Sequence, residues 1–253
     1  MRPHLIMPMG GAGSRFYKDG YECPKPLIKL HGRPFFYWSA RSVCSGIEVQ
    51  DLTFVVLEEH VTRFRIEEEI YAYFPDARIR TIERVLPGPV YTAREAVSDM
   101  KDGAAVIVND CDHMFGCSRL WKDMKASQID FDAALLAFQS DLPQYSYIKY
   151  DESGKIAGVA EKDPVSQTAV SGAYIFKNAD LFMDASGEAV KTALNEVYMS
   201  SLYNVISGWG LSIKKYDTDF HVEFGTPAEY ESAKNAQYFQ IFKAEDTVMK
   251  ERK

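Results

Sequence analysis

The feature that most constrains the fold is an alternation, over the first 130 residues, of short apolar runs with amphipathic stretches. The apolar runs have the length of buried strands, and the stretches between them carry apolar side chains at helical spacing. The predicted strands are 4–9, 52–57, 78–83 and 104–108, and the predicted helices are 61–74, 90–100 and 118–127. Strands that alternate with helices form mostly parallel sheets. The pattern therefore predicts an α/β chain with a doubly wound sheet.

Single residues predict where helices begin and end. Pro75 ends the first amphipathic stretch, because proline cannot continue a helix. The hydroxyl of Ser118 is a candidate cap for the helix that starts there. Thr226 and Pro227 have the residue types of a cap and a first helical position, so they predict a long final helix.

The second half of the chain has more strands in succession. The predicted strands are 131–139, 147–150, 156–162, 169–176 and 211–216, and the predicted helices are 179–184 and 195–206. The sequence DESGK between two of these strands predicts a hairpin turn. A length of 253 residues suits one large domain. We expect a single domain over 1–253, with a nucleotide-binding half (1–130), an acceptor-binding half (131–245) and a charged tail (246–253).

Composition narrows the class of protein. A formal charge of -7 argues against nucleic acid or a membrane as partner, because both favour basic surfaces. The four cysteines contain no CxxC pair, so we expect reduced thiols and a cytoplasmic protein rather than disulfides or a zinc site around Cys111 and Cys117. No apolar stretch approaches the ~20 residues that span a bilayer, and we expect no signal peptide.

A glycine-rich loop follows the first predicted strand, in the run LIMPMGGAGSRF. Gly10, Gly11 and Gly13 leave main-chain N–H groups unobstructed, which suits an anion. The guanidinium of Arg15 adds forked donors that match phosphate geometry. The loop is therefore a candidate phosphate site, with a tight turn as the alternative.

Two well-known phosphate loops do not fit this segment. A Walker loop needs Gly-Lys followed by serine or threonine, and the dinucleotide fingerprint needs a third glycine where Phe16 stands. Lys25 lies between two prolines that fix the backbone around it, which suits a positioned cation better than a solvated loop lysine.

The segment PMGGAGSRF followed by PKPLIKLHGRPFFYW resembles the signature of the sugar-phosphate nucleotidyltransferases, also called nucleotide-sugar pyrophosphorylases. In that family a GxGxR loop precedes a Pro-Lys dipeptide, a short strand, a Gly-[Lys/Arg]-Pro turn and a helix. The resemblance implies a Rossmann-like nucleotide-diphospho-sugar transferase fold, with a mixed, mostly parallel sheet flanked by helices. It implies Arg15 and Lys25 as catalytic cations. The implied nucleotide-binding loop is Met9, Gly10, Gly11, Ala12 and Gly13.

Two aspartates follow a buried strand in VIVNDCDHMF. Side chains two residues apart in an extended segment point the same way, as a divalent cation needs, and ligands bind at this end of open α/β sheets. The resemblance implies Mg²⁺ on Asp112, with Asp110 as a further candidate. HVEFGTPAEY resembles the family's Asp-x-Gly-Thr-Pro motif, in which Glu223 replaces the aspartate as second ligand. The alternatives are a hydrogen-bonded aspartate pair and a turn that starts a helix.

Later motifs occur in the family's order. VAEKDP resembles the Glu-Lys-Pro segment, which implies that Glu161 binds the organic part of the acceptor and Lys162 its phosphate. AVSGAYIFK resembles the strand whose glycine lets the acceptor approach the backbone, which is Gly172 here. The alternatives are a solvated hairpin edge and a β-bulge.

The stretch LPGPVYTAREA lies where the family has its base-contacting glycine, which places Gly88 at the nucleobase. Glu83 stands five residues earlier, where relatives that use uridine or thymidine carry glutamine. A carboxylate accepts a hydrogen bond from the cytosine amino group but cannot donate one to a uracil or thymine carbonyl. This position therefore favours CTP.

The resemblance implies an enzyme that couples an NTP to a small phosphorylated acceptor, releases pyrophosphate and uses Mg²⁺. The acceptor could be a sugar 1-phosphate, phosphocholine or a similar compound of cell-surface polysaccharide synthesis. Two alternatives are a glycosyltransferase of the related fold, which would also use a carboxylate pair, and a non-catalytic nucleotide-binding protein. The sequence does not indicate an oligomeric state.

Overall fold

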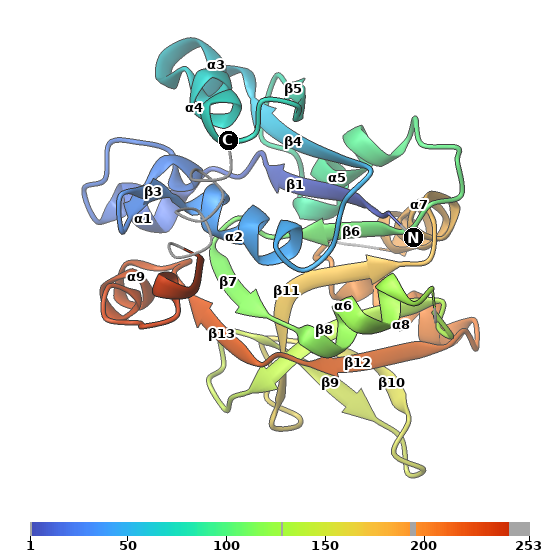
Figure 1. Cartoon of the computed structure of the whole chain (residues 1–253). Coiled ribbons are helices and arrows are strands. Elements are labelled where there is room, and N and C mark those ends of the chain that lie inside the picture. The colour runs from blue at the N-terminus through green and yellow to red at the C-terminus, as the bar shows by residue number, and fades with distance from the viewer. Residues whose placement is uncertain (1, 128, 193–195, 243–253) are drawn as a thin grey trace.

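A mixed nine-stranded sheet runs through both halves of the chain in the computed structural model, which describes residues 2–127, 129–192 and 196–242 (Figure 1). Four neighbouring strands in the order β5-β4-β1-β6 are parallel. Their bounds are Arg78–Ile82 (β5), Asp51–Leu57 (β4), His4–Met9 (β1) and Val106–Asn109 (β6). The mostly parallel sheet predicted for the first half is confirmed.

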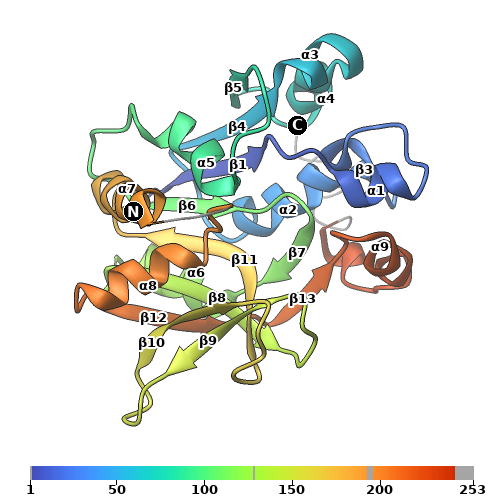
Figure 2. The same cartoon turned by 180° about the vertical axis from the view of Figure 1, so that it is seen from behind.

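Helices cover both faces of this sheet, as opposite views show (Figures 1 and 2). Side chains of β1 alternate between the two buried layers, with Leu5 and Met7 in one and Ile6 in the other. Burial on both faces explains why this strand is apolar throughout. One layer contains α2 (Phe35–Cys44), α4 (Ile66–Tyr73) and α6 (Ser118–Lys125), and the other contains α5 (Pro89–Val97), α7 (Ala179–Thr192) and α8 (Ser201–Gly208).

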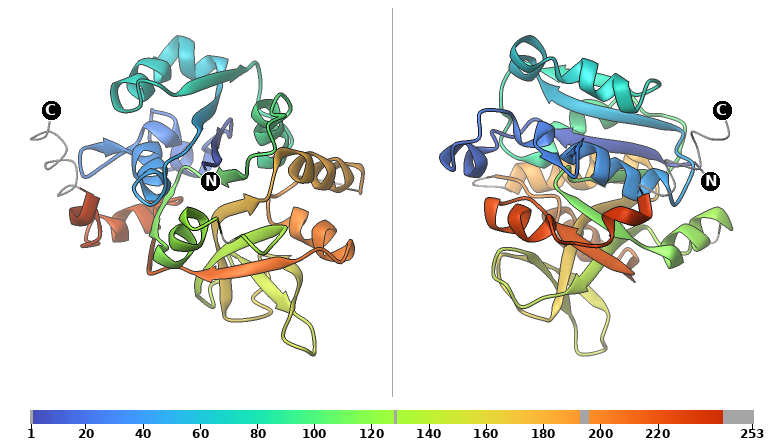
Figure 3. Two further views of the ribbon diagram at one scale, coloured as in Figure 1. Left: turned by 45° about the vertical axis from the view of Figure 1, so that its right-hand side comes forward. Right: turned by 60° about the vertical axis from the view of Figure 1, so that its left-hand side comes forward.

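The second half of the chain extends the sheet beyond β6. Strand β11 is antiparallel to both β6 and β8, and β12 is parallel to β8. Strands β9 and β10 form an antiparallel arm that extends away from the body of the molecule in the side views of Figure 3. The bounds are Ala133–Gln139 (β8), Ser146–Tyr150 (β9), Ile156–Glu161 (β10), Thr168–Phe176 (β11) and Ile213–Asp217 (β12).

A separate two-stranded ribbon joins β7 (His113–Gly116) to β13 (Phe220–Glu223), and the sequence did not predict it. The strands are antiparallel, with Glu223 directly opposite His113. Beside this pair, the Phe224 N–H donates to the Asp112 carbonyl at 2.9 Å. The ribbon therefore brings together the two segments that carry the predicted metal ligands.

Two local predictions about helices were wrong. The stretch 61–74 is two helices, α3 (Glu58–Phe64) and α4, because Arg65 adopts a left-handed conformation (φ 53°) between them. Ser118 does not cap α6. Its N–H and its hydroxyl both donate to the Asp219 carboxylate at 2.7 Å, so a residue from a distant segment satisfies this helix end.

At the C-terminal side, the Thr226 hydroxyl accepts from the Glu229 N–H at 3.3 Å, which confirms the predicted cap. The helix that follows, α9 (Pro227–Ala233), is short rather than long. The predicted charged tail lies outside the described residues, as does the first residue of the helix predicted over 195–206. No helix in the described part of the chain is long and apolar enough to cross a bilayer.

The segment that follows the glycine-rich loop has the predicted order. A short helix α1 (Ser14–Lys18) precedes a 3₁₀ turn η1 (Lys25–Leu27), a two-residue strand pair and the buried helix α2. The strand pair is β2 (Lys29–Leu30) and β3 (Arg33–Pro34). The short strand, turn and helix that the resemblance implied after Lys25 are therefore present.

Candidate functional site

The C-terminal ends of β1 and β6 border a cavity of about 630 Å³. A smaller hollow of about 190 Å³ adjoins it and shares several lining residues, Arg15, Asp110, Asp112 and Tyr198 among them. The cavity is lined by the predicted residues Met9, Gly10, Gly11, Ala12, Gly13, Arg15, Lys25, Gly88, Asp110 and Asp112, and the hollow by Glu161, Gly172 and Glu223 as well as Arg15 and the two aspartates. Most of the predicted site residues therefore lie along one continuous depression.

Two glycines of the loop have different structural roles. Gly13 has φ 60°, which glycine adopts without strain, and it precedes α1. A methyl group on Gly10 would lie 2.6 Å from Cδ1 of Ile82 and 3.1 Å from the Thr92 side chain. A methyl group at position 10 would therefore force the Ile82 side chain of β5 to shift, apart from any role of Gly10 toward phosphate.

Lys25 and Asp112 form an ion pair inside the cavity, with Nζ 2.7 Å from Oδ2. Burial opposes a charge on Lys25, but the neighbouring carboxylates outweigh burial and raise its pKa, so the ammonium stays charged. Burial also opposes a charge on Asp112, and the charge and hydrogen bond of Lys25 outweigh it and lower the pKa of Asp112. The site therefore holds a fixed cation and a fixed anion in contact.

Further carboxyl groups crowd around this pair. Burial, and then the charge of Asp112, raise the pKa of Asp110 to about 7. Burial, followed by Asp112 and Glu229, raises the pKa of Glu223 well above its ordinary value. More acidic groups converge here than the nearby cations neutralise, and this excess is typical of a site that receives a cation.

Arg15 is exposed and lies on the wall shared by both hollows. Within the described part of the chain its guanidinium has no ion-pair partner. It is therefore available to a ligand in either hollow.

On the acceptor side, the Ser146 and Ser200 hydroxyls both donate to Oε2 of Glu161, the second at 2.9 Å. These bonds hold the Glu161 carboxylate at the wall of the small hollow. Lys162 is not among the residues that line either hollow. Its Nζ lies 3.2 Å from the hydroxyl of Tyr198, which lines both hollows, and 3.9 Å from Oε1 of Glu161.

Glu83, the predicted base-reading residue, is exposed and does not line the cavity. The wall near Gly88 is made instead by residues 85–89, together with Thr92 and Glu196. A one-residue match in a loop could not predict which side chains of that loop face inward.

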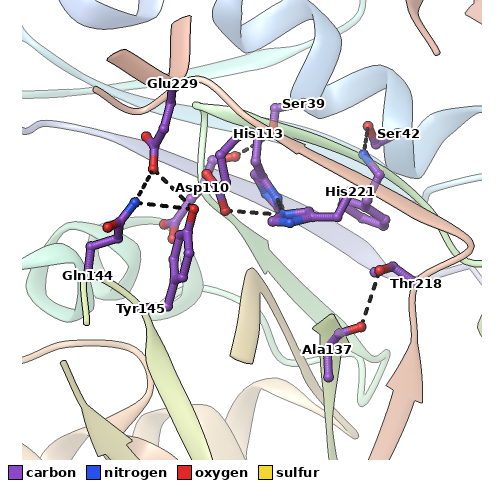
Figure 4. A network of polar contacts seen from close by, with 12 residues as sticks. Ser39, Ser42, Asp110, His113, Ala137, Gln144, Tyr145, Thr218, His221 and Glu229 are labelled. Carbon is purple, nitrogen blue, oxygen red and sulfur yellow. Dashed lines mark hydrogen bonds and ion pairs between the residues drawn. The ribbon is translucent and has the colours of Figure 1, made fainter. Parts of the chain in front are cut away.

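Three residues of the small hollow were not found by sequence reasoning. The Gln144 amide and the Tyr145 hydroxyl both donate to Oε1 of Glu229, at 2.9 and 3.2 Å (Figure 4). Glu229 belongs to a Thr-x-x-Glu pattern, which by itself indicates only a helix cap. Gln144 and Tyr145 lie in the loop before β9, where no motif marks them.

A family model described as Nucleotidyl transferase matches residues 4–203, which include the glycine-rich loop, Lys25, both aspartates and the acceptor-side residues. The chain belongs to the nucleotidyl transferase family. The resemblance drawn from the opening loop is thereby confirmed, and the protein is a nucleotidyltransferase. No curated protein matches the sequence significantly.

Several solved structures share the fold. A nucleoside-diphosphate-sugar pyrophosphorylase from Vibrio cholerae RC9 is 24% identical with a TM-score of 0.77, and the match covers 92% of this chain and 100% of that one. An inositol-1-phosphate CTP transferase from T. maritima is 16% identical (TM-score 0.72, 92% and 95% covered). A UDP-glucose pyrophosphorylase complexed with UDP-glucose is 15% identical (TM-score 0.72, 95% and 100% covered). These likenesses confirm the Rossmann-like fold.

Proposed function

We propose that this nucleotidyltransferase joins an NTP to a small phosphorylated acceptor, with release of pyrophosphate, and supplies precursors for cell-surface polysaccharides. The acceptor is a sugar 1-phosphate, phosphocholine or a similar compound. The observation that carries the proposal is the continuous depression, with the glycine-rich loop at one end, Glu161 and Gly172 at the other, and the Lys25–Asp112 pair between them.

In the proposed reaction an oxygen of the acceptor phosphate attacks the α-phosphorus in line. A new P–O bond forms, the bond between the α-phosphorus and the oxygen bridging to the β-phosphate breaks, and its electron pair leaves with pyrophosphate. An acceptor phosphate is largely ionised at neutral pH, so no strong general base is needed. The barrier is repulsion between anions and charge on the leaving group, and positioned cations lower it.

Each cation has a proposed place in this scheme. Arg15 binds the leaving phosphates, which suits an exposed guanidinium without an ion-pair partner among the described residues. When nucleotide enters, the Lys25 ammonium leaves the Asp112 carboxylate and contacts the α-phosphate region. Lys162 is assigned to the acceptor phosphate on the resemblance alone, because it lines neither hollow and its ammonium contacts Tyr198.

The residues present fit Mg²⁺, whose preferred ligands are carboxylate oxygens and phosphates. Asp112 and Glu223 are the proposed ligands and Asp110 a third candidate. Burial and the neighbouring carboxylates raise the pKa of Asp110 and of Glu223, which marks an excess of negative charge at this place. Mg²⁺, when bound, neutralises phosphate charge and orients the phosphates for in-line displacement. The protein's part is to hold these carboxylates where the ribbon β7–β13 brings them together.

The proposed preference for CTP rests on Glu83, and the position of that side chain outside the cavity wall does not support it. A panel of four NTPs against phosphorylated sugars, phosphocholine and related acceptors, with pyrophosphate release as readout, tests base and acceptor together. Release with one acceptor class and a clear NTP preference is the expected result. If UTP or dTTP is preferred, the proposed role of Glu83 is wrong.

The same panel tests the general proposal against its alternative. If no pair releases pyrophosphate, and a finished NDP-sugar raises thermal stability more than any NTP, the protein is a glycosyltransferase of the related fold instead. Stabilisation by NTP together with pyrophosphate release supports the proposed reaction.

A further inference from the structure

Three side chains of the types that bind metal ions converge on the ribbon beside the proposed catalytic site. Nδ1 of His113 lies 3.3 Å from Nε2 of His221 (Figure 4). The same His221 nitrogen lies 3.2 Å from Oε1 of Glu223. Among the described residues, these three form the one group of three or more His, Cys, Asp or Glu side chains whose ligand atoms all lie within 4.8 Å. His221 and Glu223 are two residues apart on β13, and His113 is paired with Glu223 across the ribbon.

The hydrogen bond between His113 and Asn109 shows which nitrogen of the His113 ring carries the unshared electron pair. The Asn109 amide donates to the carbonyl of Ser39 at 3.2 Å, so its oxygen must face Nε2 of His113, 3.0 Å away. Nε2 of His113 therefore carries the hydrogen, and Nδ1 of the neutral ring carries an electron pair. This electron pair points at Nε2 of His221, which the Glu223 carboxyl group also contacts. Nε2 of His221 carries at most one hydrogen, so it cannot donate to both of these neighbours.

The spacing matches a four-coordinate metal ion. Metal–nitrogen bonds of ~2.0–2.1 Å in a tetrahedron place neighbouring ligand atoms about 3.3 Å apart. The two separations within the cluster, 3.3 and 3.2 Å, are close to this value.

The surroundings provide support and access. A ligating histidine usually donates its other N–H to a fixed acceptor, and the Asn109 oxygen is such a partner for His113. His221 and Glu223 also line an open groove of about 470 Å³ beside α9, which shares Tyr145, Glu223 and Glu229 with the small hollow. An ion could therefore enter, and an outer ligand could complete its coordination, from that side.

We propose that His113, His221 and Glu223 bind a Zn²⁺ ion that clamps β7 to β13. Two imidazoles and one carboxylate are a donor set that zinc binds and that Mg²⁺, which prefers oxygen, does not. The ion would bind Oε1 of Glu223, which faces His221, and leave Oε2 for the proposed Mg²⁺. Through the ribbon it would also fix the position of Asp112. The proposal goes beyond the proposed function, because it does not depend on which substrates the cavity accepts.

Co²⁺ titration of the chelator-treated, full-length protein tests this proposal directly, because four-coordinate Co²⁺ absorbs strongly in the visible range. The expected result is a saturable band at one ion per chain, which Zn²⁺ abolishes and excess Mg²⁺ leaves unchanged. No band in the wild-type protein overturns the proposal and indicates that a hydrogen shared between His221 and Glu223 fills the site. Loss of the band on adding Mg²⁺ also overturns it.

Variants locate the ion. His221→Phe removes a ligand but keeps an aromatic ring beside Phe138, and it should abolish the band. His60→Phe, at a buried histidine outside the cluster, is the matched control and should keep the band. Asn109→Ala should weaken binding about 10- to 100-fold by freeing the His113 ring.

Asp112→Asn separates this site from the proposed Mg²⁺ site. The variant should keep the Co²⁺ band while it impairs pyrophosphate release, whereas failure of the proposed function alone would leave the wild-type band in place. A band that survives His221→Phe, or one that Asp112→Asn removes, places the ion in the acidic pocket and contradicts the ribbon site.

Discussion

Gly225→Ala should damage catalysis far more than folding. A methyl group on Gly225 would lie 2.3 Å from Oδ2 of Asp112 and 3.1 Å from its Cγ. To regain ordinary contact, the Asp112 carboxylate must move by about 1 Å, because non-bonded atoms pack at about 3.5 Å. That movement breaks the 2.7 Å contact with Lys25 and displaces a proposed Mg²⁺ ligand.

The magnitude follows from this displacement. A misplacement of about 1 Å in a catalytic arrangement costs ~10²-fold in rate, which corresponds to about 2.7 kcal/mol of transition-state stabilisation. The cost in stability should be small, because the methyl group meets the end of a side chain and Gly225 is not in the left-handed region.

The assay is kcat/KM for pyrophosphate release with the best NTP and acceptor, together with Tm. Gly208→Ala is the matched control, because a methyl group there meets nothing within 4 Å. The reasoning is refuted if Gly225→Ala keeps wild-type kcat/KM, or if its rate loss is explained by a fall in the folded fraction.

Three further substitutions test separate parts of the account. Lys25→Ala should lower kcat ~10²-fold or more, as loss of one preorganised cation does, and near-normal turnover would remove Lys25 from the catalytic set. Asp112→Asn should raise the Mg²⁺ concentration needed for half-maximal rate, and a titration that overlays wild type would exclude it as a ligand. His4 is buried, which opposes its charge, but hydrogen bonds to Asp51 and Asp102 outweigh burial and raise its pKa. Its contribution to the unfolding free energy is therefore full below about pH 6.5 and is lost as pH rises through the raised value. Urea unfolding of His4→Asn should differ most from wild type in acid, and a difference that is equal at about pH 5.5 and about pH 9 would contradict this assignment.

The sequence predicted those parts of the fold that depend on local patterns. Strand β1 is buried on both faces, so its apolar run is visible, and the glycine-rich loop follows it directly. The loop and the two aspartates were found because each follows a buried apolar strand, and Lys25 was found because two prolines flank it. The break at Arg65 was missed because the apolar spacing continues across it. Only the left-handed backbone conformation of Arg65 separates the two helices.

The ribbon β7–β13 could not be predicted in the same way. Its strands have four residues each, too few for a periodic pattern, and they pair segments about a hundred positions apart. His221 carries no local signal, since its partners His113 and Glu223 meet it only through this pairing. Lys162 and Glu83, in contrast, were predicted from motifs. A motif can place a residue near a site without showing which way its side chain points.

The most direct test of the central claim is a crystal structure of the protein with a bound nucleoside triphosphate and Mg²⁺. The account predicts the phosphates against the main chain of residues 10–13, with Arg15 at the outer phosphates, Lys25 turned from Asp112 toward the α-phosphate, and Mg²⁺ on Asp112. Phosphates bound elsewhere, with the Lys25–Asp112 pair undisturbed, would contradict it.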